Sequence, residues 1–92
     1  MPRPRLYRKI ALNPKVTFYK PQGVPLRSLE AVELSCEEWE ALRLKNVEGL
    51  DQSNSARKMQ TSQSTFQRIL SAAHKKISRA LVEGKAIKII KA

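Results

Sequence analysis

Long apolar runs, cysteine and histidine are scarce in this chain of 92 residues. The longest unbroken apolar run has three residues, as in Ile10 to Leu12, whereas a transmembrane helix needs about 20 and a secretory signal about 7–15. The single cysteine, Cys36, excludes an internal disulfide, and one histidine, His74, cannot complete a zinc-binding set. We therefore expect a cytoplasmic protein without a membrane segment, a metal or a cofactor.

Acidic residues are also scarce, since 8 of them stand against 18 lysines and arginines and leave a net charge of +10. Residues 1–28 carry seven basic residues and no acidic one, residues 29–52 have a net charge of −5, and residues 53–92 have one of +8. Such a basic chain is typical of nucleic-acid-binding proteins. The acidic middle segment either packs away from that partner or only balances the basic segments within the fold.

Aromatic residues make up 5% of the chain, and there is no glycine-rich phosphate loop and no nucleophile paired with a base. We therefore expect that the protein is not an enzyme. Few aromatics also argue against single-stranded RNA, whose bases stack on such side chains. An RNA-binding protein and a protein-interaction module, for example one that docks on RNA polymerase through the acidic segment, are the alternatives to a DNA-binding protein.

The length indicates a single domain. It divides into a basic arm with short strands, a helix-turn-helix core and a C-terminal strand, at residues 1–34, 35–84 and 85–92. Prolines and glycine in the first part exclude a long helix. Val16 to Lys20 and Ala31 to Leu34 are predicted strands. Ile87 and Ile89 alternate with a lysine, which indicates a terminal strand that pairs with Val16 to Lys20 of its own chain or of a second one.

Three helices are predicted in the core. Ser35 and Glu38 have the spacing of a capping box, so the first helix begins at Ser35 and ends near Lys45 to Gly49. Asp51 is a suitable N-cap for a short second helix over Gln52 to Met59.

Ser62 opens the longest helix, over residues 63–83, and Gly84 is well placed to end it. Its apolar residues recur at steps of three and four and form one stripe: Phe66, Ile69, Leu70, Ala73, Ile77, Ala80 and Leu81.

The second and third helices have the features of a helix-turn-helix. Ala56 is the small residue that lets the two helices approach, and Met59, Phe66 and Ile69 are apolar residues at suitable distances. Gln60 stands at the turn position, where a positive φ is needed and glycine is usual. Three helices that pack a core without any ligand would show the same stripe.

The face opposite the stripe carries the residues that we expect to contact DNA. Arginine pairs with guanine and glutamine with adenine. The predicted base-reading residues are Gln63, Ser64, Gln67 and Arg68. The predicted phosphate contacts are Arg57, Lys58, Ser62, Thr65, Ser71, Lys75 and, in a proline-rich arm of the kind that enters minor grooves, Arg3 and Arg5.

Several blocks of the sequence resemble the uncharacterised protein family 0251: Met1 to Arg5, Lys20 to Leu26, Leu34 to Leu44, Ser64 to Leu70 and Ala80 to Ala86. The resemblance covers nearly the whole chain. It implies a small bacterial or archaeal DNA-binding protein whose helix-turn-helix is similar to the fourth region of sigma factors. The chain departs from the family in the turn, where Gln60 and Thr61 replace Gly and Val, and at the cap of the second helix, where Asp51 and Asn54 stand.

We therefore expect a mainly α fold, a three-helix helix-turn-helix with a small β element from the terminal segments. Sequence-specific binding of double-stranded DNA in transcription regulation is the predicted function. One recognition helix reads few base pairs, so we expect a homodimer. In the cell, such a protein would associate with the nucleoid.

Overall fold

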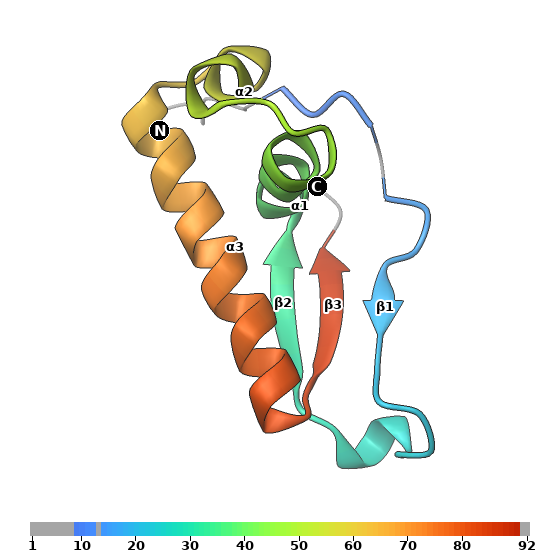
Figure 1. Cartoon of the computed structure of the whole chain (residues 1–92). Helices are drawn as coiled ribbons and strands as arrows, with labels where there is room; N and C mark the ends of the chain where they lie inside the picture. Colours follow the sequence, from blue (N-terminus) through green and yellow to red (C-terminus); the bar gives the residue numbers. More distant parts are fainter. Residues whose placement is uncertain (1–8, 13, 91–92) are drawn as a thin grey trace, which may run out of the picture.

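The computed structural model describes residues 9–12 and 14–90, and its fold is mainly α with a small β element, as predicted (Figure 1). Three helices, two short helical turns and three strands follow one another in the order β1 (Phe18–Tyr19), η1 (Leu26–Ser28), β2 (Ala31–Ser35), α1 (Cys36–Leu42), η2 (Arg43–Val47), α2 (Gln52–Lys58), α3 (Gln63–Glu83) and β3 (Ala86–Ile90). Among the described residues, no helix is both long and apolar enough to cross a membrane.

The three strands form one sheet in the order β1-β3-β2. β1 runs antiparallel to β3, with Phe18 opposite Lys88, and β2 runs parallel to β3, with Val32 opposite Ile87. The terminal strand therefore pairs with the N-terminal segment of its own chain, in which β1 covers Phe18–Tyr19 rather than Val16 to Lys20. The Ile89 N–H also donates to the Thr17 carbonyl, at 2.8 Å. On its other side, β3 forms backbone hydrogen bonds with the parallel strand β2.

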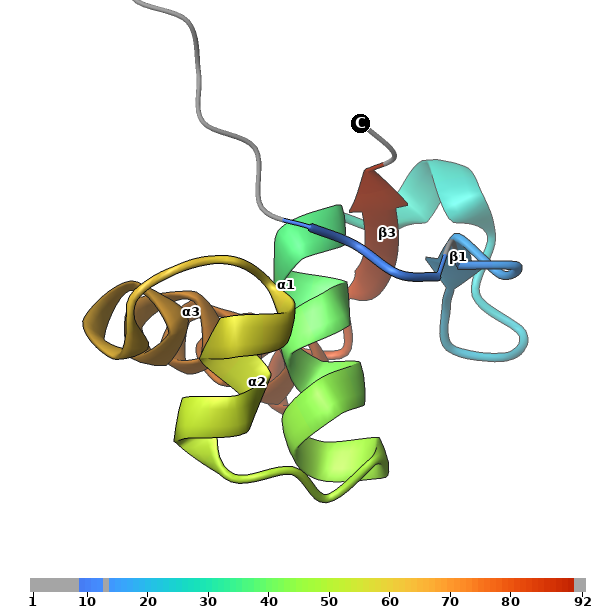
Figure 2. The ribbon, with the colours of Figure 1, turned by 90° about the horizontal axis from the view of Figure 1, so that it is seen from above.

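α1 begins with the predicted capping box. The Glu38 N–H donates to Ser35 Oγ at 3.1 Å, and the Ser35 N–H donates to Glu38 Oε1 at 2.8 Å, which satisfies two amides that a helix start leaves unpaired. The helix continues into η2, a π-helical turn in which the Glu48 N–H donates to the Arg43 carbonyl. α1 lies between the α2–α3 pair and strands β1 and β3 (Figure 2).

α3 supplies side chains to two apolar clusters. Phe66 and Leu70 lie in the first cluster with residues of α1 and α2, whereas Ala73 packs with Leu34 and Ile89 of the sheet in the second. The predicted stripe is wrong at Leu81, which is 76% exposed while Ala80 is buried. The stripe ends there because the chain turns at Gly84 and β3 comes back along the side of α3 that faces the sheet.

Several carboxylates of the acidic middle segment are paired within the fold. Glu40, of which 1% is exposed, receives two hydrogen bonds from Arg43, at 2.7 and 2.8 Å. These bonds raise the pKa of Arg43 above its ordinary value, although its partial burial opposes the effect. Glu38 pairs with Lys76, and Glu30 with Lys85, both at 2.9 Å. Glu30 and Glu38 thus balance basic residues of the C-terminal segment and Glu40 balances one of its own segment, which agrees with the interpretation of charge balance within the fold.

The Glu40–Arg43 pair should be a strong determinant of stability. Glu40→Ala would remove two hydrogen bonds from a largely buried guanidinium, which keeps only its contact with Glu48 at 3.3 Å. The Ala11 N–H that donates to Glu40 Oε2 would also lose its partner. We expect a loss of about 3 kcal/mol in the free energy of unfolding, measured by urea denaturation. Glu40→Gln should cost less, because an amide oxygen still accepts the Ala11 N–H.

Arg79→Ala is the control, since it removes an ion pair whose two side chains are 61% and 45% exposed, and exposed pairs contribute little. A loss for Glu40→Ala that is no larger than the loss for Arg79→Ala would contradict the structural role of the buried pair.

Candidate nucleic-acid interface

The turn between α2 and α3 has the backbone geometry that a helix-turn-helix needs. Gln60 has a φ of 56° and is the only non-glycine residue with positive φ in the described part of the chain. Its N–H donates to the Arg57 carbonyl, and the Thr61 N–H donates to the Ala56 carbonyl, both at 3.0 Å. This pair of bonds closes a helix through a left-handed residue. The prediction of a positive φ at Gln60 is therefore confirmed.

The packing across the turn also agrees with the prediction. Ala56, Met59 and Phe66 are at most 2% exposed and belong to one cluster, against which Ile69 packs. A larger side chain at Ala56 would push the two helices apart. The turn and this cluster together fix the direction in which α3 leaves α2.

The N-terminus of α3 leaves two backbone amides available. Ser62 Oγ accepts the Thr65 N–H at 3.1 Å, and the Ser62 hydroxyl donates to the Thr65 hydroxyl at 2.9 Å. Both hydroxyls predicted to contact phosphate thus already serve the helix cap. The amides of Gln63 and Ser64 make no hydrogen bond within the described residues, and helix-start amides of this kind bind anions.

All six polar side chains predicted on the outer face of α3 are exposed and lie on the same side of the helix: Gln63, Ser64, Gln67, Arg68, Ser71 and Lys75. Gln67 Nε2 donates to Ser71 Oγ at 3.2 Å, and Arg68 Nη2 lies 3.5 Å from Thr65 Oγ1. These bonds are exposed to water and can therefore be exchanged for bonds to another molecule at little cost.

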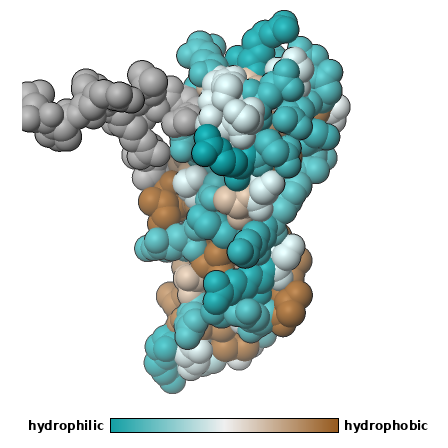
Figure 3. All heavy atoms as spheres, turned by 90° about the vertical axis from the view of Figure 1, so that its left-hand side faces the viewer, coloured by the Kyte–Doolittle hydropathy of each residue, from teal (hydrophilic) through white to brown (hydrophobic). Residues whose placement is uncertain are grey.

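The outer side of α3 is hydrophilic where the helix begins, and hydrophobic side chains gather towards the opposite end (Figure 3). Leu81 and Val82, near the end of α3, are 76% and 86% exposed. No acidic residue occurs from Gln63 to Val82. The outer face of α3 is therefore polar and carries no acidic residue over the turns that hold the predicted contacts.

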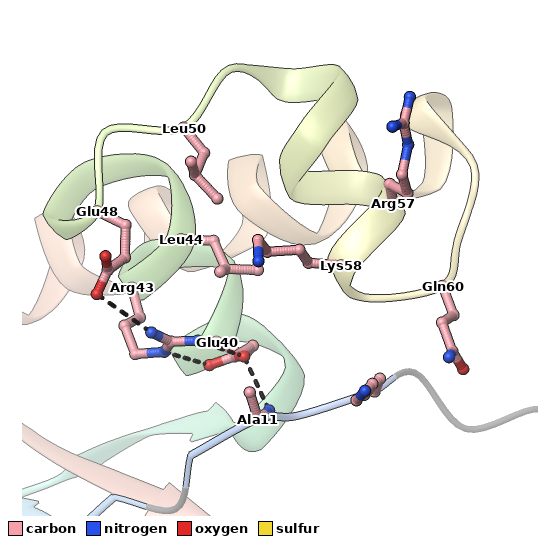
Figure 4. A pocket seen from close by; sticks show the side chains of 10 residues that line it. Ala11, Glu40, Arg43, Leu44, Glu48, Leu50, Arg57, Lys58 and Gln60 are labelled. Carbon is pink, nitrogen blue, oxygen red and sulfur yellow. Dashed lines mark hydrogen bonds and ion pairs between the residues drawn. The ribbon is translucent and has the colours of Figure 1, made fainter.

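Arg57 and Lys58 both line an open cavity of about 470 Å³. The Lys58 side chain extends across it towards Leu44, whereas the Arg57 side chain extends in a different direction (Figure 4). Lys9 lines the same cavity as Lys58. The two predicted phosphate contacts of α2 therefore border the same cavity, although their side chains point in different directions.

The N-terminal segment is attached beside the turn, which the sequence analysis did not predict. The Lys9 N–H donates to the Met59 carbonyl at 3.0 Å, and the Ala11 N–H donates to Glu40 Oε2 at 3.0 Å. Arg3 and Arg5, the predicted arm contacts, lie outside the described residues. The signal that was missed is Glu40 itself, a carboxylate on the inner side of α1 three residues before an arginine.

The remaining polar groups that could do chemistry serve the fold. His74 Nε2 lies 2.9 Å from Asn46 Oδ1 and links α3 to η2, and the buried Cys36 thiol donates to the Ile90 carbonyl. In residues 9–12 and 14–90 there is no group of three or more His, Cys, Asp or Glu side chains that could hold a metal ion.

Comparison with known proteins supports the resemblance found in the sequence. The profile of the family described as "Protein of unknown function DUF134" matches residues 1–92. A UPF0251 protein of Halothermothrix orenii is 50% identical over 96% of this chain and 65% of its own length. UPF0251 proteins of Dehalococcoides mccartyi and Moorella thermoacetica are 53% and 52% identical over 97% of this chain, and over 76% and 60% of their own lengths.

This chain therefore spans about two thirds of the length of these relatives. No solved structure matches it significantly.

Gln60→Gly should stabilise the protein by about 0.5–1 kcal/mol, because glycine adopts a positive φ without the side-chain strain that glutamine has there. The free energy of unfolding from urea denaturation measures the effect. The matched control is Gln67→Gly, which makes the same change inside α3 and should destabilise by about 0.5–1 kcal/mol. Equal losses for both variants would show that Gln60 is not held in the left-handed conformation.

Proposed function

We infer that this chain, which belongs to the family described as "Protein of unknown function DUF134", binds double-stranded DNA sequence-specifically through its helix-turn-helix. The observation that supports this most is the outer face of α3. It is polar, exposed and free of acidic residues over its first five turns, and a buried cluster and a tight turn hold the opposite side of its N-terminal half against α1 and α2.

In this proposal, the N-terminal half of α3 lies in the major groove. Gln63, Ser64, Gln67 and Arg68 read base edges there, since arginine pairs with guanine O6 and N7, and glutamine with adenine N6 and N7. The amides of Gln63 and Ser64 point along the helix axis towards a phosphate. The binding is non-catalytic, and the protein acts as a transcription regulator on the nucleoid.

Phosphate contacts flank the reading face. Lys75 lies seven residues beyond Arg68, about 10 Å further along α3, where the helix leaves the groove. Arg57 and Ser71 are exposed on the α2–α3 unit. Lys9 is hydrogen-bonded to Met59 beside the turn, and Arg3 and Arg5, which lie outside the described residues, stay predicted phosphate contacts.

We propose that the protein binds as a homodimer, because one recognition helix reads few base pairs. Pairing of the terminal strands does not support this dimer, since β3 has both its partners within the chain. The alternative of docking on RNA polymerase through the acidic segment would use its exposed residues Glu33, Glu48 and Asp51. Glu38 and Glu40 are not available for it, because they are buried and paired with cations.

Binding to DNA should depend strongly on salt. If about six phosphates are neutralised, the logarithm of the association constant should fall against the logarithm of salt concentration with a slope near −5. Fluorescence anisotropy of a labelled duplex from about 50 to about 300 mM salt measures the slope. A slope near zero would remove the polyanion-binding proposal.

Arg68→Ala and Lys75→Ala separate base reading from phosphate contact. Arg68→Ala should cost about 1–3 kcal/mol on a selected duplex and much less on a scrambled one, because a base contact is lost. Gln67→Ala should behave in the same way. Lys75→Ala should weaken both duplexes alike and reduce the salt slope by about one.

These variants change exposed residues, so circular dichroism should show intact helices in each. Equal losses on both duplexes for Arg68→Ala would show that this side chain touches only the backbone, and the assignment of the reading face would then be wrong. No loss from any of the three would leave α3 with a structural role.

A further inference from the structure

The outer edge of β2 has unpaired backbone groups. The Ala86 N–H donates to the Glu30 carbonyl at 2.9 Å, and backbone groups of a strand point alternately to its two sides. Val32 and Leu34 therefore pair with β3, and the N–H and C=O groups of Ala31 and Glu33 point away from the sheet. Both residues are exposed, and these groups have no hydrogen-bond partner in the described part of the chain.

An open cavity of about 390 Å³ lies along this edge, between β2 and the flank of α3. Four cationic side chains line it, against one carboxylate, that of Glu33: Lys75, Lys76, Arg79 and Lys85. Three of these cations lie in α3, where Arg79 follows Lys75 by four residues and Lys76 by three and is therefore a neighbour of both on the helix surface.

The four cations differ in how far they are already neutralised. Lys76 pairs with Glu38, and Lys85 pairs with Glu30 and Glu83. The hydrogen bonds that Lys85 donates to Glu30 and then to Glu83 raise the pKa of Lys85, so it stays charged. Lys75 has no ion pair among the described residues, and Arg79 has only a long, exposed one at 3.4 Å. The edge therefore faces positive charge that is not fully compensated.

We propose that this groove binds an extended, acidic peptide segment of a partner protein, which adds a strand to the free edge of β2. Strand addition would supply a donor and an acceptor for each of Ala31 and Glu33. Side chains alternate along a strand, so glutamates or aspartates at every second position would face Lys75 and Arg79.

Two other occupants fit the groove less well. A DNA backbone has phosphate oxygens but no donors, so it leaves the two carbonyl groups of the edge unpaired. A second copy that paired through the same edge would bring both sets of cations together around the symmetry axis. The edge thus favours a peptide, and the cations favour an acidic one. This inference concerns a second surface, which shares Lys75 with the proposed DNA contacts, and it does not rest on DNA binding.

The probe is a short, end-blocked fluorescent peptide in which glutamate alternates with threonine, titrated against the whole chain by fluorescence anisotropy without DNA. Arg79→Glu should weaken its binding about tenfold or more, because a like charge then faces the glutamates. Arg68→Glu is the matched control, since it makes the same charge change on the same helix but outside the groove, and it should leave peptide binding nearly unchanged.

A second probe tests the backbone pairing and leaves the protein unaltered. The same peptide, N-methylated at alternate residues on its pairing side, cannot donate to the edge and should bind about tenfold more weakly. Hydrogen exchange at the Ala31 and Glu33 amides should slow when the unmodified peptide binds. These two results, with the response to Arg79→Glu, would support strand addition.

Three results would overturn the proposal: no binding of the acidic peptide, equal binding of the N-methylated peptide, or an equal loss for Arg68→Glu and Arg79→Glu. Equal binding of the methylated peptide would mean attraction by charge alone. Equal losses for both variants would place the peptide on the outer face of α3. None of these results bears on DNA binding, which the salt and duplex titrations test separately.

Discussion

A single apolar stripe along α3 holds the two halves of the molecule together. Phe66 and Leu70 pack against α1 and α2, and Ala73 packs against Leu34 and Ile89 of the sheet. With 21 residues, α3 is about 31 Å long, which allows one helix to serve both clusters. Because the stripe buries one side of the helix in the core, the polar residues on the opposite side are exposed to solvent. The candidate interface is thus a consequence of the packing.

The local features of this fold could be predicted because neighbouring residues determine them. The caps Ser35, Asp51 and Ser62 each accept the backbone N–H three residues later, and Gln60 takes its positive φ from the turn between two packed helices. The same holds for the candidate interface, whose exposed residues follow from the 3.6-residue period of α3. Identification of the site from the sequence rests on that period and on the absence of acidic residues.

The features that were not predicted depend on residues far apart in the chain. The parallel pairing of β2 with β3 joins segments about 55 residues apart and leaves no local signal. Glu40 belongs to an acidic segment whose composition does not indicate that this carboxylate is buried, whereas Arg43 and the Ala11 amide allow its burial. Leu81 continues the apolar period but lies beyond the point where Gly84 turns the chain back. In each case contacts between distant segments determine the pairing or the burial, and the residue pattern of a single element gives no information about those contacts.

The central claim is that the outer face of α3 binds double-stranded DNA, and backbone-amide NMR of the labelled protein titrated with a duplex tests it most directly. The account predicts shift changes concentrated from Arg57 to Lys75, largest at the Gln63 and Ser64 amides, with β1 and β3 nearly unaffected. Changes confined to the β2 edge, or no change at duplex concentrations that saturate basic helix-turn-helix domains, would contradict it.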